Sequence, residues 1–193
     1  MSEDTIQDFN ISEEMLEIIG KEFDVEALVD KFASAVKGKE SRATEDAARE
    51  IFGAYGHNLA LRSLELGDKY SDATYEAIKT VVAKLEYLYW PIVPQRFVEI
   101  AYLSVMPIQS RNLNILQNNG EKLKYALSAA DCGIYHEVAG KCGEKIADSL
   151  PCRYACNACF ETILEGLKID GYAVTIEETI AKNGRCVFSA SRP

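Results

Sequence analysis

Six cysteines are the residues of this 193-residue sequence best suited to chemistry, and all of them lie in its last third. They are Cys132, Cys142, Cys152, Cys156, Cys159 and Cys186. The N-terminus is acidic and lacks the basic start and apolar run of an export signal, so we expect a cytoplasmic protein. In that reducing compartment, grouped thiols indicate a metal or reactive-thiol site rather than a set of disulfides.

Three of these cysteines have a spacing that suits metal binding. Cys152, Cys156 and Cys159 stand at positions i, i+4 and i+7, which share one face of an α-helix. Thiolates prefer soft or borderline metals, so this face predicts a zinc ion or a [4Fe-4S] cluster, with Cys186 as a further ligand. Two other interpretations stay open: a catalytic or redox thiol, and small apolar side chains packed in the core.

Candidate acid–base groups lie near the thiols in the sequence. Cys132 and His136 are four residues apart, so a helix that begins there would direct both side chains the same way. Each is a candidate catalytic residue and, with Cys142, a candidate fourth metal ligand. Glu178 is a candidate general base or hard ligand. The other histidine, His57, lies in a helical pattern and is a weaker candidate.

Charge and hydropathy exclude two classes of partner. The formal net charge is −9, and no cluster of lysine and arginine offers the basic face that nucleic-acid binding requires. The apolar runs fall short of the roughly 20 residues of a membrane span. The expected partner is therefore a small molecule, and an aromatic group near two prolines is either packed core or the wall of its pocket. This group consists of Tyr87, Tyr89, Trp90 and Phe97.

The first half of the sequence has the periodicity of helices. Apolar residues repeat at helical spacing over about 13–23, 24–36, 43–66 and 71–89. Gly53 and Gly56 interrupt the third segment and predict either a kink or a close contact with another helix. We expect residues 1–40 to form a helical arm, which is a candidate homodimerisation segment. Residues 41–193 are expected to form the ligand-binding or catalytic domain.

The second half has the alternation of strands. Residues 97–104 alternate, and two hairpins are expected around Asn119-Gly120 and Asn183-Gly184. Two helices, over about 133–150 and 152–167, carry cysteines between these hairpins. The order predicts an α+β fold in which N-terminal helices pack on an antiparallel sheet of hairpins.

The sequence from about residue 95 to the end resembles two groups of proteins. The resemblance rests on Asn119-Gly-Glu-Lys-Leu-Lys-Tyr-Ala-Leu, then Cys132, then the cysteines of 152–159 with Glu165-Gly166, and finally Glu177-Glu178-Thr-Ile-Ala-Lys-Asn-Gly184-Arg-Cys186-Val-Phe188. This order resembles the L-2-amino-thiazoline-4-carboxylate hydrolase-like family. It is also similar to the 4-vinyl-reductase-type ligand-binding domain.

The first resemblance implies an enzyme. The hydrolase family opens a small sulfur–nitrogen ring, and the match would place Cys132, Cys156 or Cys159 at its active site. We therefore expect a hydrolase or sulfur-chemistry enzyme that acts on a small cyclic or thio compound.

The second resemblance implies a sensor or carrier, which is the alternative function. The ligand-binding domain holds small apolar or aromatic compounds, sometimes beside a zinc bound by cysteines and a glutamate. Carried over, that site would use Cys152, Glu178 and Cys186. The sequence departs from the pattern over residues 179–181, where no cysteine stands. The additional thiols Cys156 and Cys159 can replace the missing ligand.

Overall fold

The computed structural model describes residues 13–69, 101, 113–118, 122–128, 132–169 and 171–192. The helix expected over 71–89, the aromatic group and the Asn119-Gly120 turn lie outside these residues. Of the strand expected over 97–104, only Ala101 is described, and it is helical rather than extended.

The strands form one antiparallel sheet. They are β1 (Leu113–Asn118), β2 (Lys122–Ser128), β3 (Ala173–Glu178) and β4 (Arg185–Ser191). Their order in space is β1-β2-β4-β3, and each neighbouring pair is antiparallel. The last strand of the chain therefore lies inside the sheet, where both of its edges are paired. This arrangement confirms the predicted α+β class.

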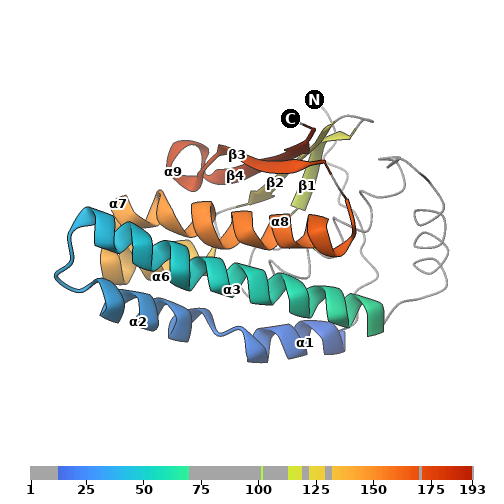
Figure 1. The fold of residues 1–193 in the computed structure, drawn as a ribbon. Coiled ribbons are helices and arrows are strands. Elements are labelled where there is room, and N and C mark those ends of the chain that lie inside the picture. Colours follow the sequence, from blue (N-terminus) through green and yellow to red (C-terminus); the bar gives the residue numbers. More distant parts are fainter. Residues whose placement is uncertain are drawn as a thin grey trace.

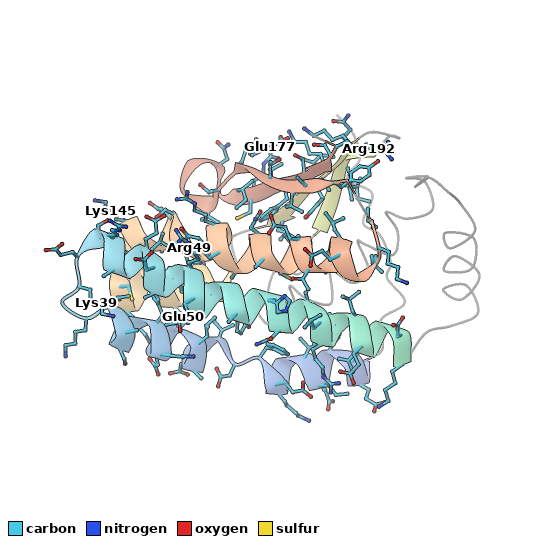
Figure 2. The ribbon with its side chains drawn as sticks, viewed as in Figure 1. Lys39, Arg49, Glu50, Lys145, Glu177 and Arg192 are labelled. Carbon is cyan, nitrogen blue, oxygen red and sulfur yellow. The ribbon has the colours of Figure 1, made fainter. Side chains whose placement is uncertain are left out.

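One face of the sheet carries the core. Side chains alternate between the faces of a strand, so Cys186 and Phe188 of β4 point the same way. The Phe188 ring stacks on Tyr125 of β2 with ring centroids 5.7 Å apart, and it meets Phe160 edge to face at 4.8 Å. The opposite face carries charged side chains as well as the buried Val187: Figure 2 shows Glu177 on the side of the sheet that faces away from the helices.

The helices form layers beneath this apolar face. In Figure 1, α8 (Asn157–Gly166) lies directly under the sheet, and α3 (Ser41–Lys69) lies on the other side of α8. The helices α1 (Glu13–Glu22) and α2 (Val25–Val36) cover the far side of α3. Within the described part of the chain, no helix combines the length and apolar character that crossing a bilayer requires.

The start of α2 follows the sequence closely. The Asp24 side chain accepts hydrogen bonds from the backbone N–H groups of Glu26 (2.8 Å) and Ala27 (3.2 Å), which fixes the first turn. The helix then buries Phe32 against Phe52 of α3, with ring centroids 4.6 Å apart. Residues of the first 40 thus contribute to the same apolar core as the cysteine-bearing helices.

The long helix α3 runs without a break through both of its central glycines. A methyl group added to Gly53 would meet no atom within 4 Å, whereas one on Gly56 would overlap the backbone of Ala155. Of the two sequence-based alternatives, a kink and a close helix contact, the structure shows the contact, and it involves Gly56.

Two details of the C-terminal half differ from the sequence-based prediction. The helix expected over 133–150 is divided into α6 (Gly133–Cys142) and α7 (Glu144–Ala147), because Gly143 between them has a positive φ of 92°. The prediction of a two-residue turn at Asn183-Gly184 is wrong, because the short helix α9 (Ile180–Asn183) connects the two strands. Gly184 ends α9 in the left-handed conformation that glycine favours.

Candidate thiol centre

Four cysteines from three parts of the chain converge under the sheet. Cys132 precedes α6, Cys152 and Cys156 occupy the two ends of the π-helical turn η2 (Cys152–Cys156), and Cys186 lies on the inner face of β4. The Sγ atoms of Cys152 and Cys186 are 3.4 Å apart, and these residues are only 4% and 5% exposed. The sulfur atoms therefore meet in a dry environment at the junction of sheet and helices.

The four thiols interact with one another. Cys152 also shares a hydrogen bond with Cys156, and Cys132 is near enough to influence both electrostatically. Burial raises the pKa of Cys132 to about 11. The hydrogen bond with Cys152, together with burial, raises the pKa of Cys186 well above its usual range. Without a counter-cation, these groups are neutral thiols at physiological pH.

The thiolate form is most favoured at Cys156. Its hydrogen bond with Cys152 stabilises the thiolate, although burial and the neighbouring thiols outweigh that effect and raise the pKa of Cys156. Cys156 is also half-buried, whereas the other three residues of the group are fully buried. It is therefore the member of the cluster where an ionised sulfur forms most easily.

Backbone amides face two of the sulfur atoms. The N–H groups of Tyr135 and Ile134, in the first turn of α6, favour the thiolate of Cys132. The N–H group of Ile180, the first residue of α9, does the same for Cys186. These amides only partly offset the effects that raise the pKa of both thiols, and the Cys132 side chain makes no capping hydrogen bond to α6.

Cys159 lies at the edge of this group. It is buried in α8, next to Cys156 and near the phenols of Tyr55 and Tyr125. Burial, reinforced by the thiols of Cys159 and Cys156, raises the pKa of both tyrosines. The structure thus groups Cys152, Cys156 and Cys186 with Cys132, and places Cys159 on the tyrosine side.

The other candidate residues lie elsewhere. His136 is exposed on α6, with its ring against Tyr135. Glu178 accepts hydrogen bonds from Asn183 (3.0 Å) and Arg185 (3.1 Å), and the bond from Arg185 lowers the pKa of its carboxyl. The described contacts therefore join neither side chain to the thiol group.

The remaining cysteine and histidine have separate surroundings. Cys142 is half-buried and lines an open cleft of about 450 Å³ between α2 and the α6–α7 pair, together with Val36 and Ile146. The His57 ring lies 2.9 Å, Nδ1 to Oγ1, from Thr162, and this hydrogen bond joins α3 to α8.

Sequence reasoning missed the tyrosines beside the thiols. Tyr55 was interpreted only as an apolar-face residue of its helix, and Tyr125, which alternates with Leu123 and Leu127, was given no role. The available signal was the hydroxyl group, because an inward tyrosine carries a polar atom into the interior.

The donor set suits a single tetrahedral ion. Within the described residues, no three or more cysteine, histidine or acidic side chains are already arranged to hold a metal ion. Two thiolates that bind one zinc at about 2.3 Å lie roughly 3.8 Å apart, however, and the Cys152–Cys186 pair is close to that separation. Side-chain movement of Cys132 and Cys156 toward this pair would complete four thiolate ligands.

Comparison with known proteins adds no relative, because no protein-family model, curated protein or solved structure matches this chain.

Proposed function

We propose that the chain is a zinc-binding domain in which Cys132, Cys152, Cys156 and Cys186 hold one ion. The observation that carries the proposal is the 3.4 Å approach of Cys152 and Cys186, with two further thiols beside them. Thiolates are the preferred ligands of structural zinc, and four of them form a closed tetrahedral site. The ion would supply the positive charge that this buried group of sulfur atoms otherwise lacks.

Zinc explains the spacing better than an iron–sulfur cluster does. In a [4Fe-4S] cluster each cysteine binds a different iron, so the ligand sulfurs stand around the whole cluster. The sulfur atoms of Cys152 and Cys186 are much closer than that arrangement allows, and their separation matches two ligands on one ion. An iron–sulfur cluster would require this pair to separate.

A closed four-thiolate site supports a role in a small-molecule sensor or carrier. Such a site leaves no coordination position for substrate, so the ion would join β4 to the helices rather than take part in chemistry. The cleft between α2 and α6–α7 is within the size range of small-ligand sites. This combination agrees with the second resemblance in the use of Cys152 and Cys186 beside a small-molecule site, but not in Glu178, which is bound to Asn183 and Arg185 and is not among the proposed ligands.

A hydrolase acting on a small cyclic thio compound is the second candidate. The observation that favours it is Cys156, the least buried residue of the group, where the hydrogen bond with Cys152 partly offsets the burial that raises the pKa of its thiol. The phenols of Tyr55 and Tyr125 lie near the same sulfur. In this case Cys156 would serve as the nucleophile and a tyrosine would hold a proton nearby.

Zinc titration separates the two candidates. Metal-free protein should take up one zinc per chain in competition with a chromophoric chelator, and the four thiols should become unreactive toward a thiol reagent. No competition with the chelator would contradict the zinc site. Ring-opening of an aminothiazoline carboxylate by metal-free protein, abolished by Cys156→Ser, would favour the hydrolase instead.

A further inference from the structure

The helix α3 touches the cysteine-bearing turn backbone to backbone. A Cβ atom on Gly56 would overlap the carbonyl group of Ala155, so only glycine permits this approach. The neighbouring Tyr55 lies near Cys156 and Cys159 and donates a hydrogen bond to the Phe23 carbonyl oxygen (3.2 Å). The closest approach of α3 to the turn therefore occurs beside the thiols.

Ala155 lies inside the turn whose ends are the two thiols. The backbone N–H of Asn157 bonds to the carbonyl oxygen of Cys152, five residues earlier, which is the wide spacing of a π turn. The position of the Ala155 peptide group therefore influences where Cys152 and Cys156 stand relative to each other and to Cys186.

The same turn is held by α3 at a second point. Glu45 accepts hydrogen bonds from the Tyr154 hydroxyl (2.7 Å) and from Nη1 of Arg153 (3.2 Å). The guanidinium of Arg49 lies over the Tyr154 ring, 5.8 Å from its centroid. Together with Gly56 against Ala155, these contacts bind three successive residues of the turn to α3. The two end residues, Cys152 and Cys156, remain directed to the other thiols.

We propose that α3 positions the thiol centre, with Gly56 and Glu45 as its positioning residues. Gly56 allows the backbone of the π turn η2 to approach α3 closely. Glu45 holds the exposed side of the same turn through Arg153 and Tyr154. The positioning role concerns the backbone of the turn, and it can be tested in metal-free protein. The inference rests on the proposed function only where zinc affinity is measured.

Two readouts test this role. In metal-free protein, diamide oxidises two neighbouring thiols to a disulfide and itself takes up their two protons and two electrons to become a hydrazine. Peptide mapping then gives the rate of cross-linking between Cys152 and Cys186. In the second readout, competition with a chelator gives the zinc affinity. Thermal melting reports general stability separately.

The variants have matched controls on the same helix. Gly56→Ala should slow the cross-link and weaken zinc binding about tenfold or more, whereas Gly53→Ala, whose added methyl group meets open space, should change neither. Glu45→Ala is the milder variant and should weaken zinc binding about threefold. Glu50→Ala, an exposed position one turn away, is its control and should not alter zinc binding.

The outcomes are distinct. Cross-linking and zinc affinity within twofold of wild type in both Gly56→Ala and Glu45→Ala would overturn the proposal. If Gly56→Ala does not fold, the comparison of Glu45→Ala with Glu50→Ala decides it by the same criterion. Failure of the wild-type protein to bind zinc contradicts the proposed function alone, because the cross-linking readout still tests the positioning role.

Discussion

The sulfur atoms of Cys152 and Cys186 lie 3.4 Å apart although 34 residues separate them in the sequence. The first belongs to the π turn before α8 and the second to the central strand β4. The contact therefore joins the helical layer to the sheet at a point where both residues are buried. A metal ion bound by both thiolates would stabilise the two layers relative to each other.

Cys186→Ser should lose the zinc ion and lower the melting temperature. A hydroxyl in place of this thiol is a poor zinc ligand, and it also introduces a more polar group into a dry site at a cost of about 1–3 kcal/mol. Metal analysis and thermal melting measure the two effects. Cys142→Ser is the matched control, since this half-buried cysteine lines the cleft by α2. Equal zinc content in both variants would contradict the assignment.

Cys132→Ala and Cys159→Ala should differ in metal content. The structure places Cys132 with Cys152, Cys156 and Cys186, whereas Cys159 lies on the tyrosine side of Cys156. We expect Cys132→Ala to bind zinc at least tenfold more weakly and Cys159→Ala to retain it. If Cys159→Ala binds zinc more weakly than Cys132→Ala, the ligands are instead Cys152, Cys156 and Cys159, as their helical spacing predicts.

The stability of metal-free protein should fall as the pH decreases from about 4.5 to about 2. Hydrogen bonds from Lys122 (2.6 Å) and Lys124 lower the pKa of Glu177 from 4.5 to about 2. A carboxyl with a lowered folded-state pKa stabilises the fold above its unfolded pKa, and protonation removes this contribution. In Glu177→Gln the free energy of unfolding should therefore fall less steeply as the pH decreases from about 4.5 to about 2.

Metal-free protein is needed for that measurement because acid also displaces zinc from thiolates. The loss at pH 7 from Glu177→Gln should stay below about 1 kcal/mol, since water screens partly exposed ion pairs. Glu17→Gln removes an exposed ion pair with Lys21 and serves as control. An equally steep fall over this pH range in Glu177→Gln would contradict the assigned ion pairs.

Phe32→Ala should destabilise the whole domain by about 3–5 kcal/mol, because truncating a buried aromatic side chain leaves a cavity. Phe32 is fully buried and packs on Phe52 of α3. Denaturant unfolding followed by circular dichroism measures the change. Leu61→Ala removes a side chain that is 48% exposed and should cost less than about 0.5 kcal/mol. If residues 1–40 fold independently of the core, Phe32→Ala will leave the main transition unchanged.

Local patterns were enough to predict the fold class. The apolar periodicity of α2 and α3, the capping residue Asp24 and the alternation of Leu123, Tyr125 and Leu127 in β2 are all visible within short windows. The pairing of β2 with β4 is different, since α6, α7, η2, α8, β3 and α9 lie between these strands in the sequence, and no local pattern specifies it.

The candidate site was predictable only in part, for the same reason. The cysteine group of 152–159 was visible as a spacing, but the π turn changes which side chains share a face. Cys132 and Cys186 join the group through the tertiary fold. The importance of Gly56 became apparent only when the backbone of Ala155 was found beside it, because a glycine within a helical segment has several explanations.

The most direct test of the zinc centre is metal and sulfide analysis of protein purified without oxygen, together with its absorption spectrum. We predict one zinc per chain, no acid-labile sulfide and no visible colour. A broad band near 400 nm with stoichiometric iron and sulfide would contradict a single zinc ion and would establish an iron–sulfur cluster. Protein that carries no metal and exposes all of its thiols to titration, even after incubation with zinc, would contradict the metal centre itself.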